Sequence, residues 1–227
     1  MPMVQLTEEE RRIFANMLRS HAYRERLAAQ RFGEGLEFVP DGEKAALEQI
    51  IGEEVAHYRG CLAVGQELGI DVESLVLARM GRDPPGIPRF YSWLDLLLAK
   101  AFNDEAGQFV LQGVIGSRIK PYSELAERII RDEKKHGGDG AKALLESWPE
   151  AHYDRQTKTR MLAVHLDAAA RCFGRPNSED DRKAVALSLK TRDSAYLLAQ
   201  FCEYGDGILR QLDHPNFVPL ARRYLRD

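Results

Sequence analysis

The chain has 227 residues, of which 44% are hydrophobic and 30% charged, and its formal net charge is −3. This is ordinary for a globular domain with a buried core, and the slightly acidic balance excludes the Lys- and Arg-rich profile of an electrostatic nucleic-acid binder. The sequence has no apolar run of the ~18 residues that a membrane span needs, no secretory-signal pattern and only three cysteines, so we expect a cytoplasmic protein without a disulfide framework.

Helical patterns dominate the first part of the chain, with no convincing alternating strand. The first predicted helix covers residues 7–32, with Thr7 as its N-cap and Glu10 as its capping-box partner. The second covers residues 41–68, and Gly69 ends it. The short link between them predicts an antiparallel pair.

A long connection separates this pair from a second one. It spans residues 69–88 and contains three prolines and a glycine between positions 84 and 88. The third predicted helix covers residues 91–118, and Pro121 begins a fourth that reaches residue 147. A connection of ~20 residues can cross the length of a bundle, which is the ferritin-like arrangement of a four-helix bundle.

The remaining sequence stays helical. We expect helices over residues 153–173 and 178–212, separated by Gly174-Arg-Pro176. We interpret them as added helices that pack on the bundle. Residues 1–227 are therefore predicted to form one all-α, ferritin-like domain, with a core bundle over about 7–147 and a C-terminal helical extension over about 153–227.

Each predicted core helix carries an acidic residue in the middle of its apolar stripe. Burying an uncompensated carboxylate costs several kcal/mol, so these groups need strong compensation. Four Glu and two neutral His give a charge of −4, which two divalent cations would balance. The predicted metal ligands are Glu25, Glu54, His57, Glu105, Glu133 and His136.

The spacing of these residues supports a metal centre. Two Glu-x-x-His motifs, at residues 54–57 and 133–136, place a carboxylate and an imidazole on one helical face. Glu25 precedes the first motif by 29 residues and Glu105 precedes the second by 28, so all four carboxylates meet at one level of the bundle. This is the ligand set of ferritin-like di-iron proteins. One such motif arises readily by chance. The support for a metal centre is that the Glu-x-x-His motif occurs twice and that each copy has a Glu at a matched distance upstream.

Several neighbours of these ligands have open roles. Because the helix phase is inferred, Asp104 remains an alternative to Glu105. The other acidic neighbours, Glu53 and Asp132, point about 100° away from the ligands and are expected to be solvated or to support them.

Polar residues on the same stripes are also ambiguous. His21 is expected to hydrogen-bond near the site or to pack in the core, and Cys61 to be a small buried residue beside it. Gln108 and Gln112 either line a polar path or face solvent. The glycines near residue 137 either allow close helix packing or mark a bulge.

The segments Gly52-Glu-Glu-Val-Ala-His57 and Arg131-Asp-Glu-Lys-Lys-His-Gly137 resemble those of the phenylacetic acid catabolic proteins, a family that includes the catalytic subunit of bacterial phenylacetyl-CoA epoxidase. The resemblance covers about residues 17–145. It implies two iron ions held by the six residues named above, O₂ activation, transfer of one oxygen atom to an aromatic thioester, and a reductase partner. The chain is shorter than that subunit and shows no recognised CoA-binding residues, which leaves the substrate open.

Three functions from different classes are compatible with these features. The first and favoured one is a di-iron oxygenase that acts on a small organic substrate, as a homo- or hetero-oligomer; manganese would be bound by the same ligands. The second is a ferroxidase or iron-storage protein. The third is a metal-free structural subunit of an oxygenase complex, which the presence of all six ligands disfavours. A rubrerythrin-like peroxidase is disfavoured because the chain has no Cys-x-x-Cys pair, and a manganese catalase has no separate support.

Overall fold

The computed structural model describes residues 5–80 and 87–214, apart from the side chains of residues 135–139. Every regular element in those ranges is helical, which confirms the all-α fold class. None of the helices described is long and apolar enough to cross a membrane.

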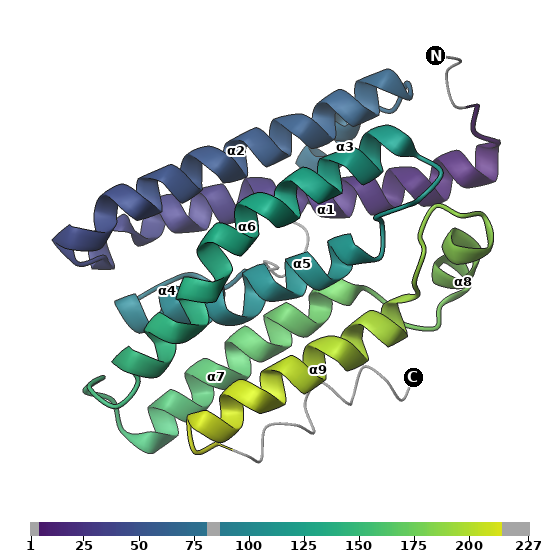
Figure 1. Ribbon diagram of the computed structural model, residues 1–227. Coiled ribbons are helices and arrows are strands. Elements are labelled where there is room, and N and C mark those ends of the chain that lie inside the picture. The colour runs from purple at the N-terminus through teal and green to yellow at the C-terminus, as the bar shows by residue number, and fades with distance from the viewer. Residues whose placement is uncertain (1–4, 81–86, 215–227) are drawn as a thin grey trace.

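The first two long helices form an antiparallel pair, α1 (Glu8–Gly35) and α2 (Lys44–Glu67), joined by the 3₁₀ turns η1 (Leu36–Phe38) and η2 (Asp41–Glu43) (Figure 1). The capping box at the start of α1 is confirmed, because the Thr7 backbone N–H donates to the Glu10 carboxylate at 2.8 Å and the Glu10 N–H donates to the Thr7 hydroxyl at 3.3 Å. At the end of α2, Gly69 has a φ of +66°, a conformation that glycine adopts without strain.

The connection after α2 contains a helix that the sequence pattern did not reveal, α3 (Val72–Arg79). Asp71 caps it by accepting a hydrogen bond from the Ser74 N–H at 3.1 Å. Val72 and Val76 are buried against the first two helices. A helix of eight residues is too short to show a clear repeat, which explains why it was missed. The predicted breakers at 84–86 lie outside the described residues.

The third long helix is interrupted. It consists of α4 (Trp93–Leu98), a π-helical turn η3 (Ala99–Asp104) and α5 (Glu105–Gln112), whereas the sequence predicted one helix over 91–118. A π turn uses i→i+5 hydrogen bonds and therefore rotates the residues after it relative to a continuous α-helix. This rotation changes which acidic side chain faces the bundle interior.

The fourth long helix, α6 (Lys120–Ser147), packs along α2 and along the α4–η3–α5 segment. It lies close to η3 at Gly140, where an added Cβ would be 2.9 Å from the Lys100 Cβ and 3.3 Å from the Lys100 backbone carbonyl carbon. Gly140 therefore permits close packing of α6 against the π turn, which was one of the two roles expected for a glycine in this stretch.

Of the three C-terminal helices described, the first and the last cover another side of α4–η3–α5, and the short middle one packs against α1 (Figure 1). They are α7 (Arg155–Ala170), α8 (Glu179–Ala186) and α9 (Ser194–Gln211), with a 3₁₀ turn η4 (Arg171–Phe173) after α7. The sequence predicted one helix over 178–212, but the chain turns between α8 and α9, where Ser188 has a φ of +56°.

A buried polar network ties α8 to α9. The Lys190 ammonium donates to the Asp181 carboxylate at 2.6 Å and to the Ser194 hydroxyl at 2.9 Å. The same carboxylate accepts a hydrogen bond from the Ser194 backbone N–H at 2.9 Å. All three side chains are buried, so this network fixes the turn between the two helices.

Two groups of buried apolar side chains form the core. One lies mainly between α1, α2 and α6 and includes Phe14, Phe32 and Ile129. The other lies between α4–η3–α5, α7 and α9 and includes Phe102 and Phe201. The acidic residues predicted from the sequence lie in and beside the first group, among well-packed side chains.

Candidate metal centre

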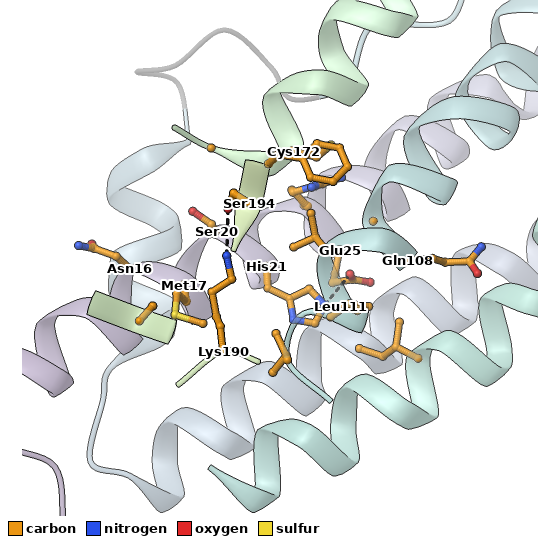
Figure 2. A pocket seen from close by; sticks show the side chains of 18 of the residues that line it. Asn16, Met17, Ser20, His21, Glu25, Gln108, Leu111, Cys172, Lys190 and Ser194 are labelled. Carbon is orange, nitrogen blue, oxygen red and sulfur yellow. Dashed lines mark hydrogen bonds and ion pairs between the residues drawn. The ribbon is translucent and has the colours of Figure 1, made fainter. Parts of the chain in front are cut away.

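Acidic side chains from α1, α2, η3 and α6 line one cavity inside the helical core. They are Glu25, Glu54, Asp104 and Glu133. Glu54 and Glu133 are only 4% and 8% exposed. Figure 2 shows Glu25 and His21 of α1 directed toward each other at the cavity. Four carboxyl groups in such a place require protons or cations to neutralise them.

Glu25 lies at the middle of this cluster. Its Oε1 is 2.9 Å from the Nε2 atom of His21, one helical turn earlier, and its Oε2 is 3.3 Å from Nδ1 of His57 on α2. The same His57 nitrogen lies 3.8 Å from Oε1 of Glu133 on α6. Glu25, Glu54 and His57 each offer a ligand atom within 4.8 Å of the others, so this group could hold a metal ion.

The His57 ring has one supported nitrogen and one unsatisfied nitrogen. Its Nε2 lies 3.4 Å from the Asp132 carboxylate, whereas its buried Nδ1 lies 3.3 Å from Glu25 Oε2 without the geometry of a hydrogen bond. A buried nitrogen without a partner is costly unless a ligand completes it. Asp132, which the sequence left as solvated or supporting, therefore orients the ring. This donor set of imidazole and carboxylates fits a divalent transition metal.

His21 and Cys61 occupy the places expected for supporting residues. The Nδ1 atom of His21 lies 3.5 Å from the Cys61 sulfur, and its Nε2 faces Glu25. Cys61 is fully buried. These contacts place both residues against the Glu25 side of the cluster.

The carboxyl groups of the cluster differ in the direction in which their pKa values are shifted. Burial would raise the pKa of Glu25, but the imidazoles of His21 and His57 more than offset it and hold that pKa well below its ordinary value. By contrast, burial and then the charges of Glu25 and Glu133 hold the pKa of Glu54 well above its ordinary value. Burial therefore favours the protonated form of Glu54 unless a cation replaces the proton.

The pKa values of the acidic groups on α6 and η3 are raised as well. Burial, followed by the charges of Asp104 and Glu25, raises the pKa of Glu133 well above its usual range. Burial also raises the pKa of Asp104 to about 7, against the opposing charges of Lys100 and Arg24. Burial lowers the pKa of His57, but Glu25 and Asp132 outweigh it and the net shift is upward. Without a metal, burial thus favours the protonated forms of these acids, and a bound metal would displace their protons.

The third-helix ligand differs from the sequence prediction in its placement. Asp104, the last residue of the π turn, lines the cavity, whereas Glu105 does not. Burial raises the pKa of Glu105, and the Gln108 side chain and the charge of Lys134 oppose that rise. The neighbours of Glu105 thus differ from those of Asp104. Straight-helix periodicity could not detect this, because the π turn shifts the phase of the following residues.

Among the six predicted ligands, the structure brings together Glu25, Glu54, His57 and Glu133, and leaves Glu105 beside them. The backbone of α6 continues through residue 136, but the His136 side chain lies outside the described part of the chain. Gln108 is 4% exposed and lines the cavity, so of its two predicted roles it does not face solvent. Gln112 does not line the cavity.

The cavity leads away from the acidic cluster. Its volume is about 250 Å³, and α1, α5, η4, α8 and the start of α9 form its walls (Figure 2). Apolar side chains such as Met17, Leu111 and Phe173 line it together with the partly buried Arg24. A small organic molecule could therefore reach the carboxylates.

No known family model and no curated protein sequence matches this chain. We therefore infer the function of the protein from the geometry of the cluster and its cavity.

Proposed function

We propose that this protein is a ferritin-like di-iron oxygenase that uses O₂ to oxidise a small organic substrate. The observation that carries the proposal is the buried cluster of Glu25, Glu54, His57 and Glu133, in which the His57 Nδ1 has no hydrogen-bond partner. Burying charged groups costs free energy of desolvation, and bound metal ions would offset that cost.

In this proposal Glu25, Glu54, His57 and Glu133 bind the metals, and Asp104 replaces Glu105 as the ligand from the third helix. His136 completes the set by its spacing of three residues from Glu133. Four carboxylates carry a charge of −4, which two divalent ions neutralise. Iron bound by such ligands supplies O₂ reduction and oxygen-atom transfer, and manganese fits the same donors.

The chain's own residues would orient these ligands. The Asp132 carboxylate, 3.4 Å from the His57 Nε2, fixes the ring so that Nδ1 faces the metals. His21, 2.9 Å from Glu25, holds that carboxylate in place on the cavity side. The buried apolar side chains around the cluster restrict the entry of bulk water.

The cavity favours an oxygenase over an iron-storage protein. Storage needs a path for iron ions and mineral, whereas about 250 Å³ of largely apolar space beside the cluster suits an organic molecule. The resemblance to phenylacetic acid catabolic proteins supports the same choice and implies electrons from a reductase. An organic substrate, O₂ and a reductase are therefore the proposed partners of this centre.

The test is an anaerobic titration of the protein with Fe(II), followed by exposure to O₂ with either two or fifty equivalents of iron per chain. An oxygenase oxidises about two iron ions per chain rapidly and leaves the excess behind. Progressive oxidation of all fifty, with the broad absorbance of a ferric mineral, would instead identify a ferroxidase. If the protein binds no iron, the remaining candidate function is the metal-free structural subunit of an oxygenase complex.

A pair of variants tests the ligand from the third helix. Asp104→Asn should lose one of the two iron ions, and Glu105→Gln should retain both, as measured by iron analysis after desalting under argon. The opposite pattern would restore Glu105 as the ligand.

A further inference from the structure

Arg24 places a positive charge in the cavity directly beside the acidic cluster. It precedes Glu25 on α1 and lines the cavity. One of its Nη atoms lies 3.8 Å from the point that a Cβ on Gly107 would occupy, one helical turn after Asp104. Its guanidinium therefore lies between α1 and α5, where a molecule in the cavity could contact it.

Arg24 has no local counterion of its own. Within the part of the chain that the structure describes, its side chain forms no salt bridge or hydrogen bond. The other cations of the cavity differ: Lys190 is paired with Asp181 at 2.6 Å, and Arg175 is exposed. A partly buried guanidinium without a partner is unusual, because its donors lose hydration without gaining bonds.

Metal binding would leave this charge unbalanced. Glu25, its neighbour on α1, and Asp104 of η3 line the same cavity as Arg24. Two divalent ions would neutralise the carboxylates of Glu25, Glu54, Asp104 and Glu133. The loaded centre would then carry one excess positive charge, at Arg24.

We propose that Arg24 binds the carboxylate of a small, otherwise apolar organic acid, which makes a monocarboxylic acid the substrate class of this centre. The inference rests on the proposed di-metal function. One guanidinium matches one negative charge, whereas a doubly charged phosphate would leave one of its charges unpaired in the cavity. Met17, Leu111, Val114 and Phe173 supply apolar walls for the rest of the molecule.

The size of the cavity supports the same class. Its volume of about 250 Å³ is below the ~300–1,000 Å³ typical of pockets for drug-sized ligands. A short-chain or monocyclic acid fits this space. A CoA thioester would place only its acyl end there, and that end carries no charge for Arg24.

The experiment measures binding by isothermal titration calorimetry, with the full chain loaded with Fe(II) under argon. The probes are hexanoate, octanoate and phenylacetate, each paired with its uncharged amide. The variants are Arg24→Gln and, as a matched control on the same helix, Arg26→Gln, since Arg26 contacts the Tyr58 ring and hydroxyl and does not line the cavity. Iron content is determined on every sample.

At least one of the acids should bind with one molecule per chain, and its amide should bind at least about tenfold more weakly, as expected for loss of a charge-assisted hydrogen bond. Arg24→Gln should lose the same factor while keeping its iron, Arg24→Lys should recover part of it, and Arg26→Gln should match the unmodified protein. Removing the iron with a chelator should weaken binding of the acid.

Equal affinity of Arg24→Gln and the unmodified protein would overturn the inference, and so would equal affinity for acid and amide, or no binding of any probe. In those cases a retained content of two iron ions leaves the proposed function standing. A protein without bound iron would show instead that the proposed function itself fails.

Discussion

Replacing Asp104 by Asn should stabilise the metal-free protein, and more so at alkaline pH. In the folded chain the pKa of Asp104 is raised from 3.8 to about 7. The fold thus favours its protonated form, and its contribution to stability falls as pH rises from the unfolded pKa through the folded one. These two values give a cost of about 2 kcal/mol at pH 5 and about 4 kcal/mol at pH 8, which Asn does not incur.

The assay is urea denaturation with a chelator present, at pH 5 and pH 8. The free energy of unfolding of Asp104→Asn should exceed that of the unmodified protein at both pH values, and the gap should widen by about 2–3 kcal/mol between them. Glu124→Gln, at an exposed position of α6, is the control and should follow the unmodified protein. A gap that stays constant with pH, or a variant that is less stable at pH 8, would refute the electrostatic reasoning.

Three further predictions concern the centre and the helices around it. Glu54→Gln should bind fewer than two metal ions per chain, measured by metal analysis, and a retained pair would contradict its role as a ligand. Asp132→Asn should weaken metal binding by about 10–100-fold in a competition titration, because it releases the His57 ring; unchanged affinity would remove that role. Lys190→Met should lower the free energy of unfolding by about 3–5 kcal/mol by leaving Asp181 without its buried partner. Lys183→Met removes a partner from an exposed ion pair and should lower the free energy of unfolding far less. An equal decrease in both variants would show that burial of the Lys190–Asp181 pair does not determine its effect on stability.

Much of the helical architecture could be predicted because it depends on local signals. Thr7 and Glu10 fixed the start of α1, and Gly69 fixed the end of α2, through hydrogen bonds and backbone conformations that involve a few neighbouring residues. The elements that escaped prediction lack such signals. The eight residues of α3 are held by burial of Val72 and Val76 against other helices, a tertiary effect.

The centre shows the same division. Glu25, Glu54, His57 and Glu133 could be identified because acidic residues interrupt apolar stripes at matched depths, and the structure brings these four together. The choice between Asp104 and Glu105 could not be made, because the π turn of η3 has no distinctive composition. The turn rotates the residues that follow it relative to a continuous α-helix, and the spacing of residues along the chain does not reveal that rotation.

The most direct test of a metal centre is a crystal structure of the protein loaded with Fe(II), with anomalous diffraction recorded at the iron absorption edge. We expect two strong anomalous peaks per chain, within bonding distance of Glu25, Glu54, His57, Asp104 and Glu133. Crystals from iron-loaded protein that show no peak among these side chains, or peaks only at surface sites, would contradict it.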